Sequence, residues 1–144
     1  MKRTYKNEVK IECDAVSQNE SLARVIVSSV LVDMHPTVEE LCDVKTAISE
    51  AVTNAIVHGY KEKIGKIRIL CRIGIDSEIY ISVTDFGKGI DDIKKAMEPM
   101  FTTDRENERS GMGFTIMKTF MDELRVTSRP GKWTKIVMKK KIHG

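Results

Sequence analysis

The spacing of apolar and polar residues follows two periods along the chain, and each period predicts one kind of element. Alternation with a period of two is typical of half-buried strands, and it predicts strands at 5–13, 67–75, 79–85, 125–129 and 134–140. A period near 3.6 predicts three longer helices: one that follows Ser17 and ends before Pro36, one at 38–58 and one at 111–124. A short polar helix is expected at 91–97, and a long polar loop at 99–110.

This order of elements predicts an α+β fold. We expect a two-layer sandwich with the helices on one face of a mixed, mostly antiparallel sheet. The chain has 144 residues and contains no repeat or linker, so we expect one domain spanning residues 1–144.

Two segments, 17–20 and 37–40, have the sequence of a capping box. In this motif the side chain of the first residue accepts a hydrogen bond from the backbone N–H of the fourth, and the side chain of the fourth accepts one from the backbone N–H of the first. The first helix is expected to bury Leu22, Val25, Ile26, Ser29 and Val30, which leaves Arg24 off the apolar stripe. The central helix has its own apolar stripe, formed by Val38, Leu41, Val44, Ile48, Ala51, Val52 and Ala55. Gly59 is expected to end this helix as the residue after its C-cap.

The central helix also carries a polar stripe. Glu50, Asn54 and His58 follow one another four residues apart and therefore lie on one face. The oxygens of Glu50 and Asn54 suit a hard cation, and Glu50 could also accept a proton. A solvated helix face is the alternative, and His58 could instead interact with the last carbonyls of the helix.

Two glycine-containing segments could bind a ligand. Segment 85–90 places the Asp85 carboxylate at a strand end before two glycines, where it could accept a hydrogen bond from an exocyclic amine such as that of adenine. The alternative is an Asp that only starts a turn. Segment 109–114 is expected to open a helix, whose free N–H groups suit a phosphate, although a flexible helix start is equally compatible with this sequence.

Composition excludes several classes of protein. The net charge is only +3, and no basic stripe is interleaved with aromatic residues, which argues against nucleic acid as a direct partner. The sequence has no secretory signal and no apolar stretch long enough to cross a membrane. The three cysteines, Cys13, Cys42 and Cys71, lack metal-binding spacing and are expected to be buried free thiols in a cytoplasmic protein.

Taken together, the motifs resemble those of the GHKL ATP-binding superfamily, which includes gyrase, Hsp90-type chaperones, histidine kinases and MutL. The shared order is Glu-x-x-x-Asn-x-x-x-His on a helix, Asp-x-Gly-x-Gly after a strand, and Gly-x-Gly after a polar lid. Segments 19–24, 49–60, 100–103 and 108–117 are most similar to the small serine-protein kinases of this superfamily that act as sporulation anti-sigma factors of the sigma-F type. The resemblance extends from about Asn7 to Lys140.

The resemblance implies the GHKL (Bergerat) ATP-binding fold, with ATP and Mg²⁺ as cofactors. In that family, the Glu that matches Glu50 is the general base, and the Asn that matches Asn54 holds Mg²⁺. The Asp that matches Asp85 reads the adenine amine, and the Arg that matches Arg109 reaches the terminal phosphate from the lid. The other positions that the resemblance assigns to the nucleotide site are Gly87, Gly89, Thr103, Gly111, Met112, Gly113 and Thr134.

The resemblance also implies protein partners. They are a sporulation sigma factor, which is held inactive, and an anti-anti-sigma factor, which is phosphorylated on a serine. The Arg that matches Arg24 belongs to the surface that grips these partners, and the family forms homodimers.

Three alternatives remain on sequence alone. A stress-response paralogue of the sigma-B type would have the same chemistry. A non-catalytic, nucleotide-dependent sigma-binding module would not require the base at Glu50. A histidine-kinase ATPase domain is disfavoured because no helical hairpin carries a phospho-acceptor His.

Overall fold

The computed structural model describes residues 4–60, 64–98 and 105–144, with backbone only at 105–111. Five strands, four α-helices and one π-helix make up this part of the chain. In chain order they are β1 (Tyr5–Asp14), α1 (Gln18–Val32), α2 (Val38–Asn54), η1 (Ala55–Gly59), β2 (Lys66–Gly74), β3 (Glu78–Asp85), α3 (Ile93–Ala96), α4 (Arg105–Phe120), β4 (Glu123–Arg129) and β5 (Trp133–Lys141).

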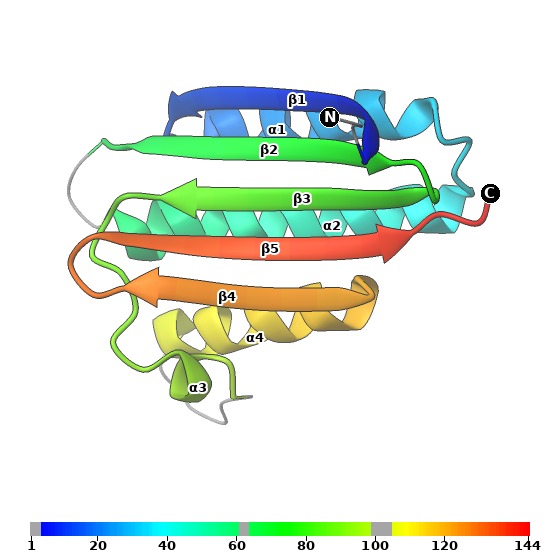
Figure 1. The fold of residues 1–144 in the computed structure, drawn as a ribbon. Coiled ribbons are helices and arrows are strands. Elements are labelled where there is room, and N and C mark those ends of the chain that lie inside the picture. The colour runs from blue at the N-terminus through cyan, green and yellow to red at the C-terminus, as the bar shows by residue number, and fades with distance from the viewer. Residues whose placement is uncertain (1–3, 61–63, 99–104) are drawn as a thin grey trace.

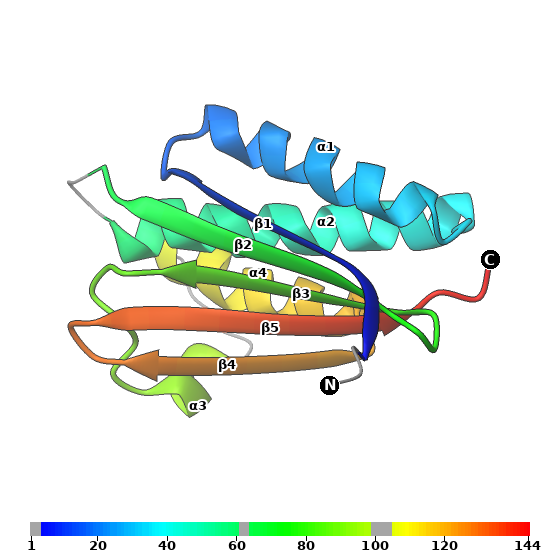
Figure 2. The ribbon, with the colours of Figure 1, turned by 45° about the horizontal axis from the view of Figure 1, so that its top comes forward.

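The strands form one sheet in the order β1-β2-β3-β5-β4, and α1, α2 and α4 all lie on the same face of it (Figure 1, Figure 2). The predicted two-layer α+β sandwich is therefore confirmed. Every pairing between the described strands is antiparallel, so the expectation of a mixed sheet is wrong in that detail. Strands that are consecutive in the chain are neighbours in the sheet, except for β3 and β4, which are connected through α3 and α4 and have β5 between them.

The core lies between the sheet and the helices, where the predicted alternation is confirmed. Ile67, Ile69, Cys71 and Ile73 of β2 point toward the helices and are buried, as are Ile79, Ile81 and Val83 of β3. Burial raises the pKa of the Cys71 thiol to about 12. The three cysteines are free, but Cys42 is exposed and Cys13 half-buried, so only Cys71 fits the expectation of a buried thiol.

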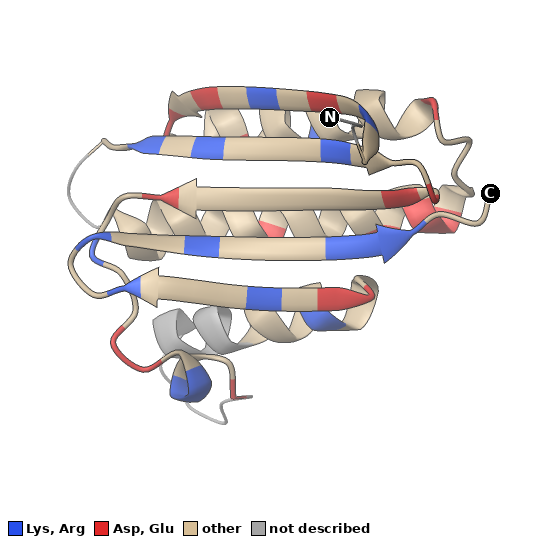
Figure 3. Ribbon diagram, viewed as in Figure 1, with Lys and Arg blue, Asp and Glu red and all other residues tan. Residues whose placement is uncertain are grey.

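The opposite face of the sheet is held in register by charged pairs. Glu12 and Arg68, and Asp14 and Lys66, lie directly opposite one another on β1 and β2 and form ion pairs at 3.4 and 2.7 Å (Figure 3). Such exposed pairs add little stability. They form only in the observed strand register, in which the apolar residues of both strands face the helices.

Helix α1 differs from the sequence prediction in two respects. Ser17 has helical backbone angles and makes no capping hydrogen bond, so the first capping box does not form. The buried residues are Ala23, Val27, Val30 and Leu31, whereas Val25 is 62% and Leu22 44% exposed. This helix is apolar on most of its circumference, so its period does not define one face, and the small Ala23 permits close packing.

Helix α2 begins as predicted. Thr37 accepts a hydrogen bond from the Glu40 backbone, and the Glu40 carboxylate accepts one from the Thr37 N–H at 2.9 Å. Val44, Ile48, Ala51 and Val52 are buried as expected, while Val38 at the helix start is 79% exposed.

Helix α4 begins earlier than predicted. It starts at Arg105, so the second half of the loop expected at 99–110 is helical, and the helix ends at Phe120 before β4 takes Leu124. Residues 105–110 are mostly Arg, Glu, Asn and Ser, and Arg and Glu favour helices. None of the helices in the described ranges is long and apolar enough to cross a membrane.

Candidate functional site

A cavity of about 330 Å³ lies where the C-terminal ends of α2 and β3 meet the first half of β5 and the loop that follows β3. These segments lie at the same end of the sheet in Figure 1. The cavity is lined by Asn54, His58, Gly59, Asp85, Lys88, Gly89, Ile90, Asp91, Ala96, Phe114, Thr134 and Ile136. Its size lies within the range typical of small-molecule sites.

Asn54 and Glu50 bring two side-chain oxygens together at the end of α2. A Cβ placed on Gly113 of α4 would lie 3.2 Å from both Asn54 Oδ1 and Glu50 Oε2. The absence of a side chain at Gly113 therefore leaves room for these two side chains beside α4. Asn54 is 8% exposed, and its Nδ2 has no hydrogen-bond partner among the described residues. A buried amide without a partner is costly and indicates a ligand-binding role.

Helix α2 does not end in the expected way, but continues as the π-helix η1 from Ala55 to Gly59. π-helical turns are rare and frequently occur at functional sites. Gly59 is the last residue of this helical segment instead of the residue after its C-cap, and its φ is not positive. It is required for space, because a Cβ there would lie 2.7 Å from Asp85 Oδ1. His58 lines the cavity from η1.

Asp85 is the last residue of β3 and is only 6% exposed. Burial raises the pKa of its carboxyl to about 6, and the hydrogen bond from the Gly87 N–H to Oδ1, at 3.0 Å, opposes part of this rise. The carboxylate thus receives one backbone donor while it lies in the cavity wall. A buried acceptor with spare capacity suits a ligand that brings its own N–H.

The glycines after Asp85 are needed for packing against backbone. A Cβ on Gly87 would lie 1.9 Å from the Gly59 carbonyl oxygen, and one on Gly89 would lie 2.5 Å from that of Arg129. Gly89 also has a φ of +73°, which glycine adopts at little cost. At both glycines the close approach is to the protein's own backbone.

Thr134 lies opposite Asp85 in the pairing of β3 with β5 and is buried in the cavity wall. Its hydroxyl is 3.1 Å from that of Ser128, which also accepts a hydrogen bond from the Ile90 N–H. The structure thus brings together Glu50, Asn54, Asp85, Gly87, Gly89, Gly113 and Thr134, seven of the residues singled out in the sequence.

Of the other predicted residues that the structure describes, Met112 and Arg24 do not line the cavity. Thr103 lies outside the described residues, as does the side chain of Arg109. Met112 is 56% exposed, and Gly111 and Gly113 lie within α4, so the prediction that this segment opens a helix is wrong. Arg24 lies on α1, paired with Glu20 at 3.6 Å and hydrogen-bonded to Ser21.

Sequence reasoning missed several residues that line the cavity. Phe114 and Ile136 lie in segments predicted only as a helix and a strand, and Lys88, Asp91 and Ala96 were assigned no role. The one feature of the sequence that could have indicated Lys88 is its position between two glycines, in a loop next to the predicted site.

The donor set fits an adenine nucleotide with a divalent cation. Apolar side chains of Ile90, Phe114 and Ile136 could contact a flat base, and Asp85 could accept its amine. Within the described ranges no three His, Cys, Asp or Glu residues form a metal cluster. Mg²⁺ requires no such cluster when it is bound through one or two protein oxygens and the phosphates of a substrate.

Comparison with known proteins identifies the family. Residues 14–140 match the model of the histidine kinase-like ATPase domain family. An anti-sigma F factor of Caldanaerobacter subterraneus is 54% identical over 138 residues, covering 96% of each chain. One from Clostridium acetobutylicum is 53% identical over 136 residues, covering 94% of each.

Solved structures agree on the fold. The RsbU and RsbW domains of a Mycobacterium tuberculosis protein match with a TM-score of 0.70 at 19% identity, covering 95% of this chain and 33% of the other. The SiaB–SiaC complex of Pseudomonas aeruginosa matches with a TM-score of 0.66 at 12% identity, covering 91% and 88%. By its sequence, its fold and the motifs around its cavity, the chain belongs to the anti-sigma F factor family of the histidine kinase-like (GHKL) ATPases.

Proposed function

We propose that this chain is a Mg²⁺-ATP-dependent serine-protein kinase that also acts as an anti-sigma factor, in one domain spanning residues 1–144. The observation that carries the proposal is the convergence of Glu50 and Asn54 on Gly113, beside a cavity whose wall contains Asp85. Phosphoryl transfer requires a base, a metal ligand and a positioned nucleotide close together, and these groups supply them.

In the proposed nucleotide complex, Asp85 accepts a hydrogen bond from the adenine amine. Thr134 lies on the adjacent strand, and Gly87 and Gly89 hold the loop that closes the cavity beside them. The unpartnered Nδ2 of Asn54 supports the presence of a ligand at this end of α2, because it has no partner among the described residues.

In the proposed reaction, Glu50 accepts the proton of the substrate serine as its oxygen attacks, and Asn54 offers its side-chain oxygen to the metal. When bound, ATP would supply the phosphoryl group, and Mg²⁺ would neutralise negative charge on the phosphates. Arg109, Gly111 and Met112 on α4 and Thr103 before it are proposed to contact the phosphates or the lid.

The proposed partners are a sigma-F-type sporulation sigma factor and an anti-anti-sigma factor that is phosphorylated on a serine. The names of the relatives support the first of these. Arg24 lines a surface groove on α1 together with Val25 and Val32, whose side chains are 62% and 60% exposed, and such a groove suits a protein partner. A homodimer is also proposed, and a monomeric mass by light scattering would count against it.

One reconstitution tests this proposal. The protein is incubated with labelled ATP, Mg²⁺, the candidate antagonist and either a sigma-F-type or a sigma-B-type factor, and labelled residues and captured factor are mapped. Label on an antagonist serine with capture of the sigma-F-type factor is expected. Capture without label would instead identify a non-catalytic binding module, and preference for the sigma-B-type factor would identify the stress-response paralogue.

A further inference from the structure

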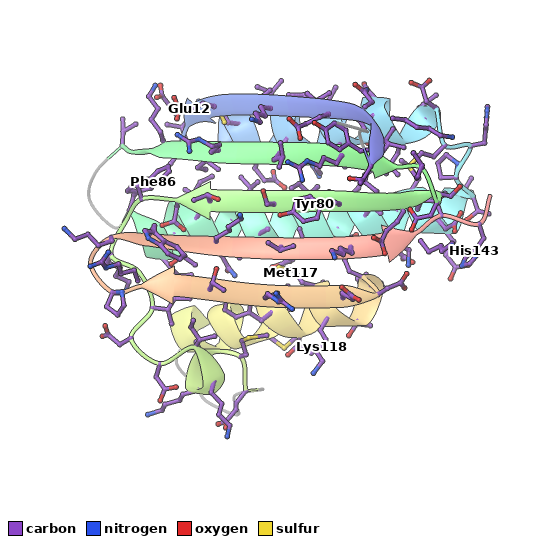
Figure 4. The ribbon with its side chains drawn as sticks, viewed as in Figure 1. Glu12, Tyr80, Phe86, Met117, Lys118 and His143 are labelled. Atoms are coloured by element: carbon purple, nitrogen blue, oxygen red, sulfur yellow. The ribbon has the colours of Figure 1, made fainter. Side chains whose placement is uncertain are left out.

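The hydroxyl of Tyr60 joins three segments at the cavity end of the sheet. It donates a hydrogen bond to the Lys66 carbonyl at 2.7 Å and accepts one from the Phe86 N–H at 2.6 Å. Tyr60 directly follows η1, Lys66 begins β2, and Phe86 directly follows Asp85. Phe86 lies just beyond the end of β3 in Figure 4. One side chain therefore ties the end of the central helix to both strands of the β2–β3 hairpin.

The ring of Tyr60 is held where it is by a glycine. A Cβ on Gly65 would lie 2.1 to 2.5 Å from three atoms of this ring, so the ring packs directly on the Gly65 backbone. The hydroxyl is protonated at neutral pH, as that of a tyrosine ordinarily is, and burial raises the pKa of Tyr60 further. It can therefore donate to one segment and accept from the other at the same time.

A second set of contacts holds the other side of the same turn. The Lys88 N–H donates to the Gly59 carbonyl at 3.1 Å, and the Gly131 N–H donates to the Lys88 carbonyl at 2.6 Å. The loop that directly follows Asp85 is thus tethered twice, at Phe86 to Tyr60 and at Lys88 to Gly59. Only the Tyr60 tether involves a side chain and can be removed by substitution without changing the backbone.

Fixing the Phe86 N–H restricts the direction of the Asp85 side chain. The peptide group between Asp85 and Phe86 is planar, so a hydrogen bond that holds the Phe86 N–H also limits rotation about the Asp85 Cα–C bond. The Cα–Cβ bond of Asp85 moves with that rotation. The carboxylate, packed against Gly59, therefore has its angle to the cavity set partly by Tyr60.

We propose that Tyr60 is a positioning residue that aims the Asp85 carboxylate at the amino group of the bound base and thereby sets base selectivity. The inference rests on the proposed reading of adenine by Asp85. Tyr60 does not touch the nucleotide in this proposal, because it is not among the residues that line the cavity.

The test compares ATP with purine riboside triphosphate, which lacks only the 6-amino group, by calorimetric titration of the full chain. The parent is expected to prefer ATP. Tyr60→Phe removes the hydroxyl and keeps the ring, and it should reduce this preference about 3–10-fold, mainly by weakening ATP. A purely structural role would weaken both nucleotides equally and leave the ratio unchanged.

Two further variants complete the test. Gly65→Ala should displace the ring while the hydroxyl remains, so it should reduce the preference for ATP in the same way, and it decides the matter if Tyr60→Phe does not fold. Tyr80→Phe, on the opposite face of β3, is the matched control and should keep the parental ratio. Parental ratios in both Tyr60→Phe and Gly65→Ala would overturn the inference alone. A parent that does not prefer ATP would overturn the proposed role of Asp85, and the inference with it.

Discussion

A buried carboxylate lies at each end of α2, and the protein shifts the pKa values of the two carboxylates in opposite directions. At the N-terminal end, Glu40 accepts hydrogen bonds from the backbone N–H groups of His143, Thr37 and Gly144 at 2.8, 2.9 and 3.2 Å. These bonds lower the pKa of Glu40 to about 2. At the other end, Asp85 receives one backbone N–H, and burial raises its pKa to about 6. His143 and Phe86 mark these opposite ends in Figure 4.

The difference separates a structural site from a ligand site. Glu40 has its acceptor capacity used by the protein, so its charge stabilises the fold. Asp85 keeps its charge at neutral pH at a cost to the fold, because few donors compensate its burial. The same end also holds the unpartnered amide of Asn54. We therefore propose that the polar groups left unsatisfied within the described residues mark where a ligand binds.

The largest effect is expected at Glu50, which lies at the end of α2 that we assign to the ligand. Glu50→Gln keeps the size of the side chain and one acceptor oxygen but removes the base. We expect phosphorylation of the antagonist serine to fall about 10²–10⁴-fold, with ATP and sigma-factor binding retained. Initial rates with labelled ATP measure this, and Glu39→Gln on the exposed first turn of the same helix is the matched control. If Glu50→Gln phosphorylates as fast as the parent, Glu50 is not the base.

Substitution of Asp85 should weaken ATP binding and strengthen the fold. Asp85→Asn can present an amide N–H to the adenine amine, and an unmatched buried donor costs about 1–3 kcal/mol, or about 5–150-fold in affinity. Without nucleotide, the variant should unfold at a higher temperature at pH 7, because it carries no buried charge. Calorimetric titration and thermal unfolding give the two readouts. Asp76→Asn, in the turn at the other end of the same hairpin, should change neither.

The raised pKa of Asp85 fixes the sign of its pH dependence. Between pH 3.8 and about 6 the folded state keeps a proton that the unfolded state has lost, so this group lowers stability as the pH rises through that window. Affinity for ATP should change in the opposite sense and fall as the pH drops through about 6. A pH profile of ATP affinity that is the same for the parent and Asp85→Asn would refute this assignment.

Glu40 should show the reverse pattern, with a loss of stability and no loss of ATP affinity. Glu40→Gln places an amide nitrogen against backbone N–H groups, and we expect a loss of about 1–3 kcal/mol in the free energy of unfolding. The folded pKa of Glu40 is lowered from 4.5, so its contribution is complete above about pH 4.5 and is lost as the pH falls toward 2. Denaturant unfolding across this range measures the difference. Equal stability of Glu40→Gln and Glu39→Gln at pH 7 would contradict it.

The sequence predicted the parts of this comparison that depend on local patterns. The alternation of β2 and β3 and the capping box at Thr37 each depend on neighbouring residues, and the structure has both. The motif spacing also selected Glu50, Asn54 and Asp85, because one helix face and one strand end bring their side chains to the same end of the sheet.

What the sequence did not predict depends on contacts between distant segments. Two of the three backbone partners of Glu40, His143 and Gly144, are more than 100 residues away in the sequence. The requirement for glycine at 59 and 87 arises where η1 meets the loop after β3. The buried face of α1 could not be chosen, since apolar residues surround most of that helix. Helix α4 begins at Arg105, earlier than the pattern predicted, and helix boundaries are the least reliable part of such a prediction. The π-helix that begins at Ala55 was not predicted either.

The smallest effect is expected at Asn54, and it tests whether unsatisfied groups mark the ligand site. Asn54→Ala removes an amide whose Nδ2 has no partner in the described part of the chain, so little stability should be lost with it. Its Oδ1 is proposed to hold Mg²⁺ together with phosphate oxygens, and the loss of one ligand among several should weaken Mg²⁺-dependent ATP binding about 3–10-fold. Titrations with and without Mg²⁺ distinguish the loss of a metal ligand from a general loss of ATP binding. Ser29→Ala, at an exposed position on α1, is the control. Unchanged Mg²⁺ dependence would mean that Asn54 is only a polar residue of the helix face. A loss of stability as large as that of Glu40→Gln would mean that the protein uses the polar groups at both ends of α2 to stabilise its fold.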